Sequence, residues 1–267
     1  MNYYGRYGLE YNPFIKNSNK EIINTSDLNE ADIRLNFLLN NKGFGLLTGS
    51  PGKGKTTVIR NWVKSLNTSL YKVIYISLST ITVQEFYRTL ALELGVEPKF
   101  RKNDNFKLIQ GEINRLSIEK RITPIIILDE ANYISSSILN DLKIIFNFDM
   151  DSKDRAIILL AGLPMINNTL RLSHHEPLRQ RITMNYNLTG LNKEEAKNYI
   201  LNKLQKAGSK DEIFSENALE AIINYSNGTP RLIDKICNNC LLIGDNQGVD
   251  TINNDIVMNA VNEVELS

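Results

Sequence analysis

The sequence predicts an α/β protein with a parallel sheet between helices, followed by a small all-helical domain. Short apolar runs alternate with helical segments through the first 190 residues, an order that is typical of a parallel sheet. A glycine-rich turn directly follows the first apolar run, and the segment after it has helical spacing. Beyond residue 190 only helical patterns remain.

Four apolar runs predict the strands. Each run is short and lacks polar alternation, which indicates a strand that helices cover on both faces. We expect strands at 44–48, 71–78, 124–128 and 156–161.

Helical spacing of apolar side chains predicts the helices between the strands. We expect these helices at 27–40, 56–65, 83–94, 106–118 and 136–148. The polar and basic segment 95–105 is expected to be a connection. The helical pattern of 193–265 is interrupted at glycines. The predicted domains are therefore an α/β core at 1–190 and a helical lid domain at 191–267.

Composition places the chain among soluble globular proteins. Apolar residues make up 42% and charged residues 23% of the chain, so a full hydrophobic core can form without a disulfide or a bound metal. The N-terminus lacks the apolar region of a signal peptide, and no apolar run approaches the ~20 residues that span a bilayer. We expect a cytoplasmic protein with no membrane partner. The net charge of +1 does not indicate a nucleic-acid binder, so such a role must rest on a local patch.

The two cysteines, Cys237 and Cys240, form a C-x-x-C pair within a helical pattern. A structural zinc site needs four ligands, and the chain has no second pair and no histidine nearby in sequence. We therefore interpret both thiols as small core residues, and few cysteines suit a reducing compartment.

A phosphate-binding loop follows the first predicted strand. It reads Gly49-Ser50-Pro51-Gly52-Lys53-Gly54-Lys55-Thr56. The glycines remove side chains that would keep an anion away from backbone N–H groups, and the next helix adds its positive end. Lys55 is expected to reach the phosphates, and Thr56 to offer a hydroxyl to Mg²⁺. The sequence thus predicts a site for ATP and Mg²⁺ in which Thr57 also lies.

Two carboxylates follow the third predicted strand. The run 125–128 is entirely apolar, and Asp129 and Glu130 come directly after it. Ligands bind at the carboxyl ends of strands in such sheets, so both side chains are expected at the phosphate site. Asp129 is expected to hold Mg²⁺ through its water shell, and Glu130 to orient and polarise the attacking water.

These motifs together resemble the AAA+ ATPases, and within them the branch of the MuB/TnsC-type transposition ATPases and the ExeA-type secretion ATPases. The resemblance covers most of the chain. The segments that carry it are 7–14, 49–56, 90–98, 128–131, 178–182 and 228–231.

The resemblance implies further nucleotide contacts. It places Asn12, Pro13 and Phe14 near the adenine, although the two apolar residues would equally serve as anchors of a terminal segment. It also implies that Arg231, after Gly-Thr-Pro, contacts the nucleotide from the helical lid as the sensor-2 arginine.

The resemblance further implies an arginine finger and hence a homo-oligomer, either a ring or a helical filament. Arg181 matches the finger that reaches the ATP of a neighbouring subunit, with Arg179 as the alternative; both could instead be a solvated pair at a helix end. A finger makes hydrolysis depend on assembly. The family usually has a polar sensor-1 residue at the end of the fourth strand, but Leu163 stands here. Hydrolysis is therefore expected to be slow unless another residue substitutes.

Within this branch the resemblance favours the transposition type. A secretion-type protein would continue into a membrane segment, and none occurs in these 267 residues. The expected function is ATP-dependent, sequence-nonspecific binding of double-stranded DNA, on which the protein oligomerises and regulates a transposase. The candidate DNA contacts are Lys99, Arg101, Lys102 and Lys107, a basic cluster that could also be an ordinary solvated loop.

Two other functions stay open. The chain could be a switch ATPase that acts on protein partners, in the ExeA-like secretion or remodelling role. It could also be a nucleotide-binding scaffold that does not hydrolyse ATP.

Overall fold

The computed structural model describes residues 3–16, 23–77, 81–209 and 212–265. These residues form two compact units. The α/β unit comprises Glu30–Pro51 and Lys55–Leu188, and the helical unit comprises Met1–Asn29, Gly52–Gly54 and Thr189–Ser267. The chain passes from the α/β unit to the helical unit between Leu188 and Thr189. The N-terminal segment differs from expectation, because it groups with the C-terminal helices and not with the core.

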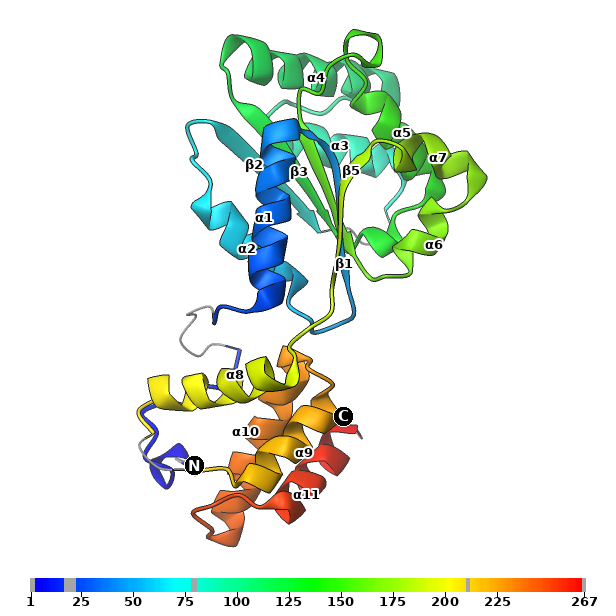
Figure 1. The fold of residues 1–267 in the computed structure, drawn as a ribbon. Helices are drawn as coiled ribbons and strands as arrows, with labels where there is room; N and C mark the ends of the chain where they lie inside the picture. Colours follow the sequence, from blue (N-terminus) through cyan, green and yellow to red (C-terminus); the bar gives the residue numbers. More distant parts are fainter. Residues whose placement is uncertain (1–2, 17–22, 78–80, 210–211, 266–267) are drawn as a thin grey trace. The chain divides into compact units, whose positions relative to one another are not determined.

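Five parallel strands form one sheet in the order β2-β3-β4-β1-β5 (Figure 1). The strands are β1 Gly43–Gly49, β2 Tyr71–Ser77, β3 Thr123–Asp129, β4 Ile157–Gly162 and β5 Ile182–Leu188. The parallel sheet confirms the predicted fold class. Strand β5 was missed: its apolar residues alternate with polar ones, as in a half-buried edge strand, and form no continuous apolar run.

The α-helices that accompany the sheet in the described residues are α1 Ser26–Asn41, α2 Lys55–Ser65, α3 Val83–Leu94, α4 Lys102–Asn114, α5 Ser136–Ile145, α6 Ile166–Leu170 and α7 Glu176–Arg179. Helix α4 begins inside the segment that we expected to be a connection. The side chain of Asn105 explains this early start, because it accepts from the N–H of Lys99 at 2.7 Å and donates to the Lys99 carbonyl at 2.9 Å. The turn before α4 is thereby closed.

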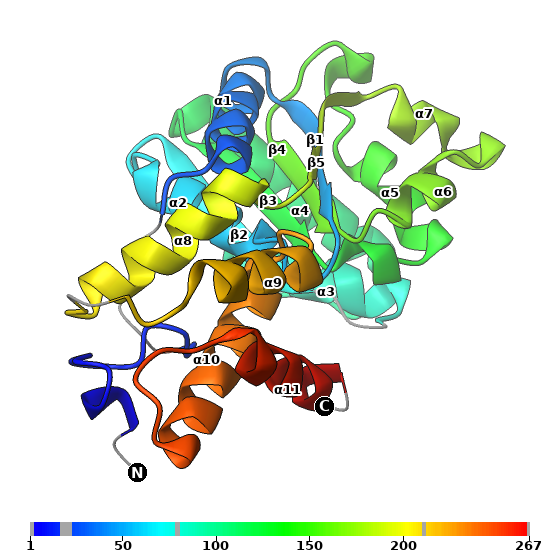
Figure 2. The same cartoon turned by 60° about the horizontal axis from the view of Figure 1, so that its bottom comes forward.

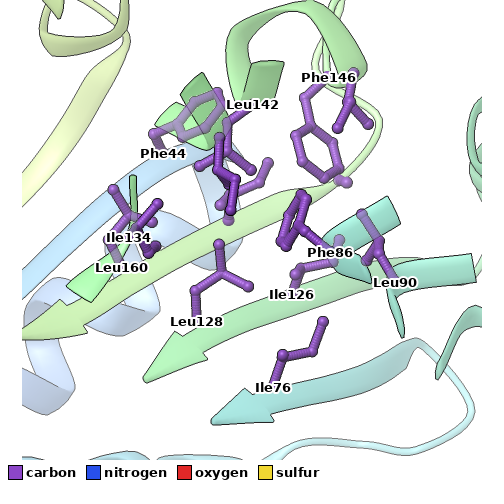
Figure 3. Close-up of a cluster of buried hydrophobic side chains, with 14 of the residues drawn as sticks. Phe44, Ile76, Phe86, Leu90, Ile126, Leu128, Ile134, Leu142, Phe146 and Leu160 are labelled. Carbon is purple, nitrogen blue, oxygen red and sulfur yellow. The ribbon is translucent and has the colours of Figure 1, made fainter. Parts of the chain in front are cut away.

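One face of the sheet packs against α3, α4 and α5. The even-numbered residues of β3, Ile126 and Leu128, belong to this core together with Phe86 of α3 and Leu142 of α5 (Figure 3). All four side chains are fully buried. Side chains alternate between the two faces of a strand, so the odd-numbered residues of β3, including Asp129, point to the other face.

The other face of the sheet lies toward α1 and α2. A methyl group added to Gly45 of β1 would meet the Leu38 side chain of α1 at 2.5 Å, so this face packs closely on α1. Figure 1 shows α1 and α2 together on this side of the sheet. Helix α2 begins at Lys55, directly after the phosphate-binding loop. Asp129 and the first turn of α2 therefore lie on the same side of the sheet.

The helical unit contains α8 Lys193–Lys206, α9 Glu216–Ser226, α10 Pro230–Gln247 and α11 Asn254–Glu265 (Figure 2). The N-terminal segment completes its core, because Tyr7 and Phe14 are buried among these helices, and Glu10 donates its N–H to the Ala207 carbonyl at 2.8 Å. Cys237 and Cys240 of α10 are free, fully buried thiols, and burial raises the pKa of Cys240 to about 12. None of the helices in the described part of the chain is long and apolar enough to cross a bilayer.

His175 is fully buried at the start of α5 and α7. Its Nε2 lies 3.1 Å from the Ser136 hydroxyl, whereas among the described residues no group pairs with its Nδ1. Burial lowers the pKa of His175, and the nearby charges of His174 and Lys143 lower it further. The folded state therefore favours the neutral imidazole of His175 over the protonated form.

This arrangement predicts a pH-dependent stability. Below the ordinary histidine pKa of about 6.5, the unfolded chain takes up a proton that the folded chain resists, so stability falls as pH drops. We expect His175→Gln to reduce the loss of unfolding free energy between pH 7 and pH 5, by at most about 1.4 kcal/mol per pH unit. Urea unfolding at several pH values measures this, with the exposed His174→Gln as control. If the free energy of unfolding changed equally with pH in wild type and His175→Gln, His175 would not be the source of the pH dependence.

Candidate nucleotide-binding site

The phosphate-binding loop connects β1 to α2. Gly52 and Gly54 have φ values of 79° and 98°, in the left-handed region that side chains other than glycine rarely adopt. Gly49 is held close to β5, because an added methyl group would lie 3.1 Å from the Leu188 side chain. The loop thus has the backbone shape that turns N–H groups toward an anion at the start of α2.

Lys55 is buried at the first position of α2. Its ammonium group donates to the Gly49 carbonyl at 2.7 Å and to the Ser50 carbonyl at 3.4 Å, so the charge stays within the loop. Thr56 and Thr57 follow in the first turn of α2 and are exposed. The structure brings these predicted residues together at the carboxyl end of β1.

The tip of the loop, Gly52–Gly54, belongs to the helical unit. The Lys53 ammonium donates to the Asn227 carbonyl at 2.7 Å, and burial lowers the pKa of Lys53. Arg231 donates its backbone N–H to the Gly52 carbonyl at 3.4 Å. The backbone of the predicted lid arginine therefore lies beside Gly52 within the helical unit, in the first turn of α10.

Asp129 ends β3, and its carboxylate is 4% exposed. Its Oδ1 accepts the backbone N–H of Glu130 at 2.9 Å, and its Oδ2 accepts the Tyr75 hydroxyl of β2 at 2.5 Å. Burial and the hydrogen bond to Asp129 raise the pKa of Tyr75. Tyr75 escaped the sequence analysis because only the pairing of β2 with β3 brings it to the carboxylate.

Glu130 has a left-handed backbone, with φ 54° and ψ 38°. This conformation costs about 1–2 kcal/mol for a residue that carries a side chain. Such strain is most often kept at functional sites, where it directs a particular side chain. The sharp turn after β3 places the two predicted carboxylates in succession at the edge of the sheet.

The residues at this edge fit ATP and Mg²⁺. The loop offers backbone N–H groups and the Lys55 ammonium to phosphates, and its glycine backbone leaves space for an anion. Thr56 and Asp129 offer the oxygen donors that Mg²⁺ prefers. Thr56 belongs to the first turn of α2, and Asp129 lies on the face of the sheet toward which α2 lies.

Asn132, in the turn after β3, lies beside the end of β4. Its Oδ1 accepts the backbone N–H of Leu163 at 2.9 Å, and it packs against Gly162, where an added methyl group would lie 2.8 Å from that oxygen. Its buried Nδ2 has no hydrogen-bond partner among the described residues. The sequence analysis missed this amide, although it follows Asp129 and Glu130 by only a few positions.

The two candidate finger arginines have different surroundings. Arg181 is partly buried, and its guanidinium donates to the Lys143 carbonyl at 2.6 Å, at the end of α5. Arg179 is exposed at the end of α7, and its guanidinium lies 3.8 Å from Glu176. Arg179 also donates to the Arg171 carbonyl at 3.5 Å. Both arginines thus contact a main-chain carbonyl of this chain, but only Arg181 does so while partly buried.

The predicted adenine contacts lie in the N-terminal segment of the helical unit. Asn12 donates to the Asn238 side chain of α10 at 2.6 Å, and Phe14 is buried with the Lys203 ammonium 5.6 Å from its ring centre. Pro13 between them is also buried. These contacts anchor the segment on the helices of the same unit.

The four cations that were predicted to contact DNA lie in different surroundings. Lys99 and Lys107 line a hollow of about 590 Å³ beside α4, together with the acidic Asp104. Lys102 points elsewhere, because its ammonium pairs with Asp141 of α5 at 2.6 Å. Arg101 is exposed at the start of α4. The four cations therefore do not act as one equivalent set.

Comparison with known proteins agrees with this geometry. Residues 39–170 match the family model of the AAA domain. General secretion pathway protein A of Aeromonas hydrophila is 31% identical over 243 residues, which are 88% of this chain and 44% of that protein. The chain thus spans less than half the length of this curated relative.

Two solved structures share the fold. The ORC2 protein of Aeropyrum pernix, in ADPNP–ADP complexes, matches with a TM-score of 0.67 and 19% identity over 94% of this chain and 71% of its own. The ORC1 protein of the same organism, in complex with DNA, matches with a TM-score of 0.63 and 16% identity over 95% and 69% of the respective chains. Residues 39–170 are thus similar to a AAA domain, and the chain has the AAA+ P-loop NTPase fold.

Proposed function

We propose that this protein binds ATP with Mg²⁺ and hydrolyses it slowly, as a switch that is active when copies of the chain assemble. The observation that carries the proposal is the edge where β1 and β3 end. There the buried Lys55 begins α2, Asp129 ends β3 on the same side of the sheet, and Glu130 comes directly after it. A loop that only bound an anion would not require two carboxylates at this edge.

Each residue has a defined task in this mechanism. Lys55 exchanges its contacts with the Gly49 and Ser50 carbonyls for contacts with phosphate oxygens. Thr56 and Asp129 hold Mg²⁺, which neutralises phosphate charge when bound. Glu130 accepts a proton from the attacking water and orients it.

Substitution of Lys55 and of Glu130 separates binding from hydrolysis. We expect Lys55→Ala to weaken ATP binding on the order of 100-fold, because a charged hydrogen-bond donor to the phosphates is lost. We expect Glu130→Gln to keep ATP affinity and to reduce turnover about 100-fold or more, because only proton acceptance is lost. Calorimetry measures the affinities, and phosphate release measures the turnover.

Lys64→Ala, at the exposed end of α2, is the matched control for Lys55→Ala. Wild-type ATP affinity in Lys55→Ala would refute the phosphate site. Wild-type turnover in Glu130→Gln would refute the role of Glu130 and leave the binding site intact.

We further propose that Arg179, rather than Arg181, acts on the ATP of a neighbouring subunit. The resemblance favours Arg181, but its guanidinium is engaged with the end of α5. The exposed guanidinium of Arg179 contacts Glu176 and the Arg171 carbonyl, both at the surface, so it can move without breaking a contact of the core. A cation supplied by a neighbour stabilises the charge that develops on the transferred phosphoryl group.

Mixed assemblies test this assignment. We expect Arg179→Ala to bind ATP normally and to lose about 1,000-fold in turnover. Mixing it with Glu130→Gln should restore part of the activity, because some interfaces then pair an intact Glu130 with an intact Arg179. Arg181→Ala should mainly lower the melting temperature. Recovery of activity by Arg181→Ala with Glu130→Gln, and not by the Arg179 mixture, would assign the role to Arg181.

For the partner of the assembled switch we propose double-stranded DNA, bound without sequence preference, with regulation of a transposase as the resulting activity. The exposed cations Lys99, Arg101 and Lys107 support this proposal, as does the shared fold of ORC1, whose structure contains DNA. The match to General secretion pathway protein A favours a second candidate, an ATPase that acts on protein partners.

DNA titration distinguishes the two partners. We expect the wild type with ATP and Mg²⁺ to bind a duplex of about 30 base pairs more tightly than with ADP. Replacing Lys99, Arg101 and Lys107 with alanine should lower the salt slope of binding by up to about three. The control replaces the exposed Lys64, Lys193 and Lys235, which carry the same total charge. No DNA binding at low salt in any nucleotide state would favour the protein-directed function.

A further inference from the structure

Tyr75 connects a neighbouring strand to the carboxylate that we assign to Mg²⁺. Its hydroxyl donates to Asp129 Oδ2 at 2.5 Å. The residue is 44% exposed, so burial alone does not hold it in this position. A role of Tyr75 at the nucleotide-binding site would explain this contact.

Strand register makes this contact possible. Tyr75 pairs with Ile127 in the parallel ladder between β2 and β3. Asp129 lies two residues beyond Ile127, so all three side chains leave the sheet on the same face. A diagonal neighbour on one face is within reach of a long aromatic side chain but not of a short one.

Both oxygens of the Asp129 carboxylate accept a hydrogen bond from the protein. Oδ2 accepts the Tyr75 hydroxyl, and Oδ1 accepts the Glu130 backbone N–H at 2.9 Å. One donor comes from β2 and the other from the turn after β3, so together they fix the plane of the carboxylate. Each oxygen keeps a second lone pair that can accept from a metal-bound water.

We propose that Tyr75 is a positioning residue for Mg²⁺, because its hydroxyl holds the Asp129 carboxylate in the orientation that accepts the water shell of the ion. This inference rests on the proposed ATP site. Groups that hydrogen-bond to a metal-binding side chain commonly change metal affinity 10–100-fold when they are removed. The phenol acts through Asp129 and does not touch the nucleotide.

The test compares Tyr75→Phe with wild type in the full chain. Binding of a non-hydrolysable ATP analogue is followed by calorimetry while Mg²⁺ is titrated, and again in excess chelator. We expect the half-saturating Mg²⁺ concentration to rise about tenfold, whereas analogue affinity without metal stays unchanged. Turnover at saturating Mg²⁺ should approach the wild-type value, because the carboxylate itself remains.

Tyr71→Phe is the matched control, since Tyr71 lies on the same strand and face but pairs with Thr123 at the opposite end of the ladder. An unchanged or lowered Mg²⁺ requirement in Tyr75→Phe overturns the inference while the wild-type binding curve still supports the ATP site. Loss of analogue affinity without metal would also overturn it, because the tyrosine would then shape the loop and not the carboxylate. A wild type that binds no nucleotide would refute the proposed function and this inference together.

Discussion

Parallel pairing of the strands places all their carboxyl ends along one edge of the sheet, and the whole candidate site depends on this constraint. The phosphate-binding loop leaves β1 at that edge, Asp129 ends β3 there, and Tyr75 lies near the end of β2. These strands are far apart in sequence. Only the order β2-β3-β4-β1-β5 brings their ends together. A strand slipped by one residue would move Asp129 to the opposite face of the sheet.

The parallel pairing of the strands also determines which parts of the structure could be predicted from the sequence. Strand β3 was predicted because it is buried on both faces and its apolar run is uninterrupted. The loop and the two carboxylates were predicted because their chemistry is local, and each lies within a few consecutive residues. Strand β5 was missed because its apolar residues alternate with polar ones, whereas the predicted strands were found as continuous apolar runs. The parallel α/β architecture thus follows from the sequence, while the full sheet does not.

Contacts between segments that are far apart in sequence could not be predicted from the sequence. The bond from Tyr75 to Asp129 depends on register, and the bond from Leu163 to Asn132 depends on the turn after β3. The N-terminal segment reads as an irregular aromatic stretch, and nothing local assigns it to the helices that bury Phe14. Likewise, only the structure distinguishes the engaged Arg181 from the exposed Arg179.

The left-handed backbone of Glu130 has a consequence for attempts to engineer this protein. Glycine would adopt φ 54° without the roughly 1–2 kcal/mol that a side chain adds there. Selection of variants for thermal resistance alone would therefore enrich glycine at position 130 and discard the carboxylate. Stability and chemistry oppose each other at this residue, so a library screen has to score both properties at once.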